Sequence, residues 1–175
     1  MKSCDNIYLI GMMGAGKTTI GRQIARRLKK RFADSDHEVE ARTGVKIPLI
    51  FEIEGEQGFR RRESHVLQEL TKEHGLVLAT GGGAVLDVAN RRCLAESGLV
   101  IYLRIAPELL WERTRHDKNR PLLQVVDPKA RIDELFAQRD PIYREIADIV
   151  VDVVRAAPYA GAKFLVQEIR QRCAA

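Results

Sequence analysis

The sequence predicts an α/β fold of three layers, with a central parallel sheet of five strands, helices on both faces of the sheet, and insertions between the regular elements. Three observations support this prediction. Short apolar segments alternate with segments of helical periodicity, the first apolar segment leads into a glycine-rich loop, and the composition, with 45% hydrophobic and 30% charged residues, is that of a globular domain. The 175 residues contain no internal repeat and no linker, so we expect one domain over residues 1–175.

The strands and helices are expected to alternate in the following order. Apolar runs predict strands at 6–10, 32–33, 76–80, 99–103 and 148–153. Apolar residues at helical spacing, with Pro107 and Pro158 as helix starts, predict helices at 18–30, 37–42, 47–53, 56–74, 88–96, 107–114 and 131–145, and a closing helix from Pro158. Pro141 is expected to break or bend its helix. Alternating strands and helices predict parallel pairing through right-handed crossovers.

The net charge of +5 makes nucleic acid a ligand to consider. Basic residues are spread along the chain, however, and aromatic residues make up only 6%, so the stacking platforms of single-strand binders are missing. A small anionic ligand explains the excess of positive charge equally well. We therefore expect no nucleic-acid partner.

Compartment and membrane association are predicted from apolar runs and cysteines. The apolar runs are too short to span a bilayer, and the N-terminal residues have no apolar core of the kind found in signal peptides. Cys4, Cys93 and Cys173 are scattered and lack metal-ligand spacing, so we expect reduced thiols. These features predict a cytoplasmic protein without a membrane partner.

The glycine-rich loop, Gly11 to Thr18, reads Gly-Met-Met-Gly-Ala-Gly-Lys-Thr and matches the phosphate-binding motif G-x-x-x-x-G-K-[ST] in full. An expected strand precedes it and an expected helix follows it, so backbone N–H groups and the helix N-terminus can converge on phosphate oxygens. Lys17 is expected to reach the β- and γ-phosphates, and the Thr18 hydroxyl to bind Mg²⁺. The motif predicts nucleotide binding but is shared by kinases, switch GTPases and motor ATPases.

Two carboxylates follow the second expected strand. In extended backbone, Asp34 and Asp36 point to the same side, at the carboxyl end of a strand where α/β sheets place ligands. One can hold the Mg²⁺ shell through water, and the other can orient an acceptor hydroxyl and take its proton. The alternative is structural, with Asp34 forming a turn and Asp36 capping the next helix.

Three consecutive glycines, Gly81 to Gly83, follow the strand at 76–80. A tight turn needs one or two glycines, so three favour the close approach of a ligand to the backbone.

Several arginines could bind an anionic ligand, because the planar guanidinium makes two parallel hydrogen bonds with a carboxylate or phosphate. Arg60, Arg61 and Arg62 are consecutive on an expected helix, so at most one or two of them can face one pocket. Arg120 follows a polar stretch that resembles a mobile loop, and Arg139 lies on a later helix. Taken singly, each is more commonly a surface residue.

Taken together, the ordered motifs resemble those of shikimate kinases over nearly the whole chain. The stretches that carry the resemblance are the glycine-rich loop through Gly21, Asp34-Ser35-Asp36, Ile50 to Glu56 with Phe59-Arg60, Thr80 to Val85, Arg120-Pro121-Leu122-Leu123, and Arg139-Asp140-Pro141-Ile142-Tyr143. The resemblance implies a core like that of nucleoside monophosphate kinases, a shikimate-binding region at about 34–62 and a lid at about 114–127. It also implies ATP-dependent phosphorylation of the 3-hydroxyl of shikimate, in the chorismate pathway of aromatic amino acid biosynthesis, by a monomer.

The resemblance further implies a role for each matching residue. It implies that shikimate contacts Asp36, Arg60, Gly82 and Arg139, with the two arginines on its carboxylate, and that Lys17, Asp36 and Arg120 act in catalysis. The implied ATP-binding residues are Gly14, Ala15, Gly16, Lys17, Thr18, Thr19, Arg120 and Arg155, and the implied Mg²⁺ ligands are Thr18 and, through water, Asp34. The loop at 152–158 departs from the family pattern, since Arg155 is its only candidate for an adenine contact.

Other activities share parts of this pattern. A gluconate kinase or a nucleoside monophosphate kinase would have the same loop and lid, but a nucleotide acceptor would need a pocket large enough for a base. A regulatory P-loop ATPase would hydrolyse ATP in response to a macromolecule. A non-catalytic binding module is the remaining alternative, although every expected chemical position is filled.

Overall fold

The computed structural model describes residues 4–117, 119–153 and 158–174 and confirms the predicted α/β fold. Within these residues the strands are β1 (Ile7–Ile10), β2 (Arg31–Asp34), β3 (Leu76–Ala79), β4 (Leu99–Arg104) and β5 (Ile149–Asp152). They form one five-stranded sheet in the order β2-β3-β1-β4-β5, and every neighbouring pair is parallel.

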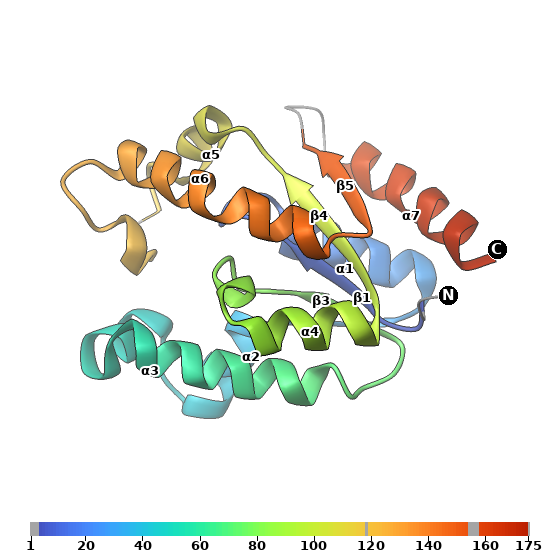
Figure 1. Cartoon of the computed structure of the whole chain (residues 1–175), viewed down its shortest axis with the longest axis horizontal. Helices are drawn as coiled ribbons and strands as arrows, with labels where there is room; N and C mark the ends of the chain where they lie inside the picture. The colour runs from blue at the N-terminus through green and yellow to red at the C-terminus, as the bar shows by residue number, and fades with distance from the viewer. Residues whose placement is uncertain (1–3, 118, 154–157, 175) are drawn as a thin grey trace.

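Helices cover both faces of the sheet (Figure 1). Helices α1 (Lys17–Leu28) and α7 (Pro158–Ala174) pack together on one face. Helices α4 (Val88–Ser97) and α6 (Pro128–Ile146) lie on the other face against β4, and α3 (Ile47–Leu70) packs beside α4. The described chain also contains α2 (Ser35–Thr43), α5 (Pro107–Thr114) and two short 3₁₀ helices, η1 (Ala84–Leu86) and η2 (Pro121–Leu123).

The core lies where the central strands are covered on both faces. All four residues of β1 and of β3 are buried, and these strands are accordingly continuous apolar runs rather than alternating ones. Since the strands are all parallel, their carboxyl ends lie at one edge of the sheet, and the loops that follow β1, β2 and β3 meet there.

The largest differences from the predicted helices are in α3 and α6. The segments expected as separate helices at 47–53 and 56–74 form one element, α3, which is kinked at Gly55 (φ 69°, ψ −179°) and ends at Leu70. Helix α6 begins at Pro128 rather than at residue 131, because Asp127 caps it by accepting a hydrogen bond from the Ala130 N–H at 3.0 Å. This helix also continues without a break through Pro141, where a break or bend was expected, and ends at Ile146.

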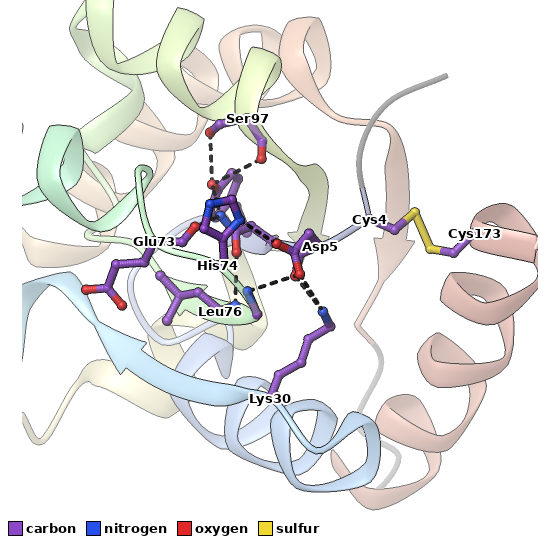
Figure 2. A network of polar contacts seen from close by, with 11 residues as sticks. Cys4, Asp5, Lys30, Glu73, His74, Leu76, Ser97 and Cys173 are labelled. Atoms are coloured by element: carbon purple, nitrogen blue, oxygen red, sulfur yellow. Dashed lines mark hydrogen bonds and ion pairs between the residues drawn. A yellow bond between two sulfur atoms is a disulfide. The ribbon is translucent and has the colours of Figure 1, made fainter.

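The expectation of three reduced thiols is wrong for two of the cysteines. Cys4 and Cys173 form a disulfide, with their Cα atoms 5.8 Å apart, and Cys93 remains free. Residue 4 precedes β1 and residue 173 lies in the last turn of α7, and the packing of α7 on α1 brings these two ends of the chain together (Figure 2). A separation of 169 residues conceals this proximity in the sequence.

The disulfide adjoins a polar network at the amino ends of the strands (Figure 2). Asp5 Oδ1 accepts a hydrogen bond from the Gly75 N–H at 3.1 Å, and Asp5 Oδ2 lies 2.8 Å from the His74 Nδ1 atom. The buried Asn6 accepts from the Leu76 N–H at 2.9 Å. These bonds fix β1 against the start of β3, at the edge of the sheet opposite the candidate site. In the described residues, no helix is long and apolar enough to cross a membrane.

Candidate active site

The phosphate-binding loop connects β1 to α1, as predicted. Gly14 and Gly16 have φ angles of 80° and 95°, values that L side chains rarely adopt, which explains two of the glycines in the motif. Lys17 is 9% exposed, and its Nζ atom donates to the carbonyl oxygens of Gly11 at 2.7 Å and Met12 at 2.8 Å. Burial lowers the Lys17 pKa to about 8, against the opposing effect of two nearby carboxylates. The lysine is thus held inside the loop.

Thr18 and Asp34 lie together at the start of α1. The Thr18 hydroxyl donates to Asp34 Oδ2 at 2.6 Å, while Asp34 Oδ1 accepts from the backbone N–H groups of Asp36 at 3.0 Å and His37 at 3.4 Å. Asp34 therefore caps α2. The structural alternative expected from the sequence also includes a cap on this helix, but it assigns the cap to Asp36 and not to Asp34. The two roles are compatible, because capping uses one carboxylate oxygen and the contact with Thr18 uses the other.

These residues fit a magnesium ion. A hydroxyl and a carboxylate are oxygen donors, and Mg²⁺ takes few protein ligands because it keeps several waters and binds substrate phosphates. When bound, the ion would neutralise charge on the β- and γ-phosphate oxygens.

A cavity of about 380 Å³ adjoins the phosphate loop through Met13. It brings together five predicted site residues from five segments of the chain: Asp36, Arg60, Gly82, Arg120 and Arg139. The other lining residues are Met13, Glu40, Lys46, Ile47, Pro48, Phe51, Phe59, Glu63, Gly81, Gly83, Asn119, Pro121 and Leu122. The cavity thus combines three arginines with three carboxyl groups, those of Asp36, Glu40 and Glu63, beside the site expected for the phosphates.

Arg139, on α6, is the most unusual group in the cavity. It is only 2% exposed, and neither its Nε nor its Nη1 atom has a hydrogen-bond partner. Burial lowers its pKa, since the charged form loses its hydration. A buried guanidinium with free donors is costly to the ligand-free protein, and an anion entering the cavity would remove that cost.

Arg60 lines the cavity, whereas Arg61 and Arg62, the next two residues of α3, do not. Its Nη1 atom donates to Glu63 Oε2 at 2.6 Å and its Nη2 atom to Glu56 Oε1 at 3.1 Å. Arg61 and Arg62 are exposed, and Arg62 pairs with Glu54 at 2.6 Å. The helical spacing therefore correctly limits how many of the three can share one pocket.

The carboxyl groups of Asp36, which is half-buried, and Glu63, which is fully buried, lie beside the triple glycine. A Cβ atom on Gly81 would overlap Glu63 Oε1 and would stand 2.8 Å from Asp36 Oδ1, so a side chain at this position is excluded. Neither of these oxygens has a hydrogen-bond partner. Burial is the main cause that raises both pKa values, that of Glu63 to about 7. The negative charge of Asp34 further raises the pKa of Asp36, and that of Asp36 further raises the pKa of Glu63.

The remaining predicted residues have different environments. Arg120 is half-buried at the start of η2, and its Nε atom donates to Asp117 Oδ2 at 2.8 Å. Thr19 is exposed on α1. Arg155, the predicted adenine contact, lies outside the described residues.

Two residues that contact the predicted site residues, Glu63 and Tyr143, were not themselves predicted as site residues. Glu63 could have been found from its place three residues after Arg60, on the same side of a helix. Tyr143 lies four residues after Arg139, and its hydroxyl donates to the Gly82 carbonyl.

Comparisons with known proteins agree with this geometry. A family model described as shikimate kinase matches residues 13–173. A shikimate kinase from Aromatoleum aromaticum is 65% identical over 152 residues, which cover 87% of each chain. One from Dechloromonas aromatica is 57% identical over 166 residues, covering 95% of this chain and 91% of the relative. A solved shikimate kinase from Acinetobacter baumannii, in complex with shikimate, matches with a TM-score of 0.95 at 50% identity, covering 98% of this chain and 96% of that one.

Proposed function

The chain belongs to the shikimate kinase family, and we propose that it transfers the γ-phosphoryl group of ATP to the 3-hydroxyl of shikimate. The observation that carries this proposal is the buried Arg139, whose free donors face a cavity that also contains Arg60 and Asp36. A small acid with ring hydroxyl groups complements this arrangement, since its carboxylate meets the arginines and its hydroxyls meet the aspartate. The products are shikimate 3-phosphate and ADP, in aromatic amino acid biosynthesis.

The phosphate loop, Gly14 through Thr19, holds ATP in this proposal. Backbone N–H groups at the start of α1 bind the phosphates, and Lys17 leaves the carbonyls of Gly11 and Met12 to bind the β- and γ-phosphates. Thr18 binds Mg²⁺ directly and Asp34 binds it through water. Arg155 remains the candidate for the adenine contact.

Acceptor binding uses the region at about 34–62 together with α6. Arg60 and Arg139 hold the shikimate carboxylate, and backbone at Gly82 contacts the ring. Asp36 orients the attacking hydroxyl and accepts its proton, a role that its raised pKa favours because a more basic carboxylate takes up a proton more readily. Since phosphoryl transfer has a loose transition state, positioning of the hydroxyl contributes at least as much as proton removal.

Closure of a lid at about 114–127 completes the site. Arg120 lines the cavity, and only its Nε atom is bonded to Asp117 in this structure, so the Nη groups can meet the transferred phosphoryl group when the lid closes. Such closure excludes water and adds positive charge where negative charge develops in the transition state.

The proposed enzyme is a monomeric single domain in the cytoplasm, with ATP and shikimate as its partners and neither nucleic acid nor membrane. The Cys4–Cys173 disulfide stands against this location, because disulfides persist mainly in oxidising compartments. In a reducing cytoplasm we expect the same two residues as neighbouring thiols.

Product analysis tests the proposal. The purified enzyme is incubated with ATP, Mg²⁺ and shikimate, and ³¹P NMR with proton coupling identifies the carbon that carries the new phosphate ester. We expect a single monoester at the 3-position. An ester on another hydroxyl would refute the proposed orientation, and the absence of any shikimate ester would refute the proposed function. Gluconate remains the alternative acceptor, as a second small hydroxylated acid.

A further inference from the structure

Tyr143 is a fully buried residue of α6 that does not line the acceptor cavity. Its ring packs against Tyr102, with ring centroids 4.8 Å apart. Its hydroxyl donates to the Gly82 carbonyl, lies 3.9 Å from the Met12 sulfur atom and also interacts with the Arg139 guanidinium. One hydroxyl group therefore contacts both the triple glycine and the phosphate loop.

The bond to Gly82 fixes backbone that does line the cavity. Gly82 and Gly83 both face it, and all described peptide bonds are trans. In a trans peptide the carbonyl and the following N–H point in opposite directions, so holding the Gly82 carbonyl also sets the direction of the Gly83 N–H. Tyr143 thus acts on the cavity through the backbone of the glycines, which have no side chains of their own to fix them.

Gly82 also lies between the phosphate loop and Arg139 of the acceptor cavity. A Cβ atom on it would lie 3.3 Å from the Met13 backbone nitrogen and 3.6 Å from Arg139 Nη1. A shift of this backbone would therefore change the spacing between the phosphate loop and the arginine that faces the cavity. Arg139 lies one helical turn before Tyr143, so the same turn of α6 carries the arginine and the group that holds Gly82.

We propose that the Tyr143 hydroxyl is a positioning group, which holds the Gly82–Gly83 peptide between the phosphate loop and Arg139 and so aligns the acceptor with the γ-phosphate. This inference rests on the proposed function. The alternative is that the hydroxyl only satisfies its own need for a partner, as buried tyrosines usually do. The two differ in outcome, because a hydroxyl that only satisfies its own bonding has no effect on acceptor kinetics. A hydroxyl that acted through Arg139, with which it also interacts, would lose its effect on the KM for shikimate in an Arg139→Ala background, whereas one that acts through Gly82 keeps it.

Tyr143→Phe tests the proposal, since it keeps the ring and its packing on Tyr102 and removes only the hydroxyl. We expect the KM for shikimate to rise about tenfold, the value for one lost hydrogen bond that leaves a carbonyl without its donor. We expect kcat to fall several-fold because the acceptor is misaligned, and the KM for ATP to change by less than about twofold, since Lys17 and the loop glycines are untouched.

Two control variants separate positioning from general destabilisation. Tyr8→Phe removes an equally buried hydroxyl, bonded to Ser97 Oγ at 2.8 Å at the other edge of the sheet. Tyr102→Phe removes the hydroxyl that donates to Asp140 Oδ1 at 2.8 Å, which loosens α6 but leaves the Gly82 bond in place. Melting temperatures show that each variant is folded, and we expect neither control to raise the KM for shikimate more than about threefold.

Each outcome decides the matter. A Tyr143→Phe enzyme with shikimate kinetics like those of Tyr8→Phe would overturn the proposal. If Tyr102→Phe reproduced the rise in KM, placement of α6 and not the Gly82 carbonyl would be the cause, and the proposal would again fail. A wild-type enzyme that does not phosphorylate shikimate would instead refute the proposed function, so the two failures are distinguishable.

Discussion

Replacing Arg139 by alanine should weaken shikimate binding strongly while it changes the free energy of unfolding only slightly. In the ligand-free structure the Nε and Nη1 atoms of this arginine have no hydrogen-bond partner, so the substitution removes no ion pair of the folded protein. Its stability cost is the lost packing of the aliphatic stem and the lost interaction with the Tyr143 hydroxyl, together about 1–2 kcal/mol, and relief of a buried charge without a carboxylate partner offsets part of that.

The effect on shikimate should be much larger. Hydrogen bonds to charged groups contribute about 1.5–3 kcal/mol, and burial of Arg139 at 2% exposure places its contribution toward the upper end. At about 1.4 kcal/mol per factor of ten, the KM for shikimate should rise by about 10- to 150-fold. The KM for ATP should change little. Arg139→Lys should recover only part of the loss, because it keeps the charge but not the planar fork.

Steady-state kinetics with each substrate varied in turn, together with denaturant unfolding, measure both quantities. Arg61→Ala is the matched control, since it removes an arginine from α3 that is exposed and does not line the cavity. Equal weakening of shikimate and ATP would show that Arg139 is a shared or structural residue. A KM for shikimate within threefold of wild type would refute the carboxylate clamp.

Three further predictions concern the base, the lid and the disulfide. Asp36→Asn keeps the shape of the side chain and should lower kcat by about 10²- to 10⁴-fold, whereas a value within threefold of wild type would exclude Asp36 as the group that orients and deprotonates the hydroxyl. Arg120→Ala should lower kcat by about 10³-fold or more while shikimate affinity measured without nucleotide stays nearly unchanged, and a near-normal rate would refute the lid assignment. Cys4→Ser should lower the free energy of unfolding by up to about 5 kcal/mol, which is the chain-entropy value for a loop of this length. Reduced wild-type protein should be as stable as the variant. Equal stability of the oxidised wild type and the variant would contradict a stabilising cross-link.

Sequence patterns predict most of this fold because parallel strands and amphipathic helices leave local signals. The phosphate loop is identified by its own residues, since the strand that precedes it and the helix that follows it are short-range features. The kink at Gly55 corresponds to the predicted gap between two helices, because glycine adopts the positive φ that ends helical geometry.

Residues that depend on tertiary contacts are harder to predict. Helical spacing limits how many of Arg60, Arg61 and Arg62 can face one pocket, but only the packed structure shows that Arg60 does so. Cys4 and Cys173 have no sequence pattern in common, and their pairing follows from the packing of α7 on α1. Tyr143 acts on Gly82, 61 residues away, and no periodicity encodes that contact.

A coupled ADP-release assay tests the central claim most directly. The enzyme is supplied with ATP and Mg²⁺, and the rate is compared among shikimate, gluconate and a set of nucleoside monophosphates at equal concentrations. Because the cavity of about 380 Å³ pairs two arginines with Asp36, we expect rapid ADP release with shikimate and a rate close to background with the others. A gluconate or nucleotide rate that equals or exceeds the shikimate rate would contradict the proposed function.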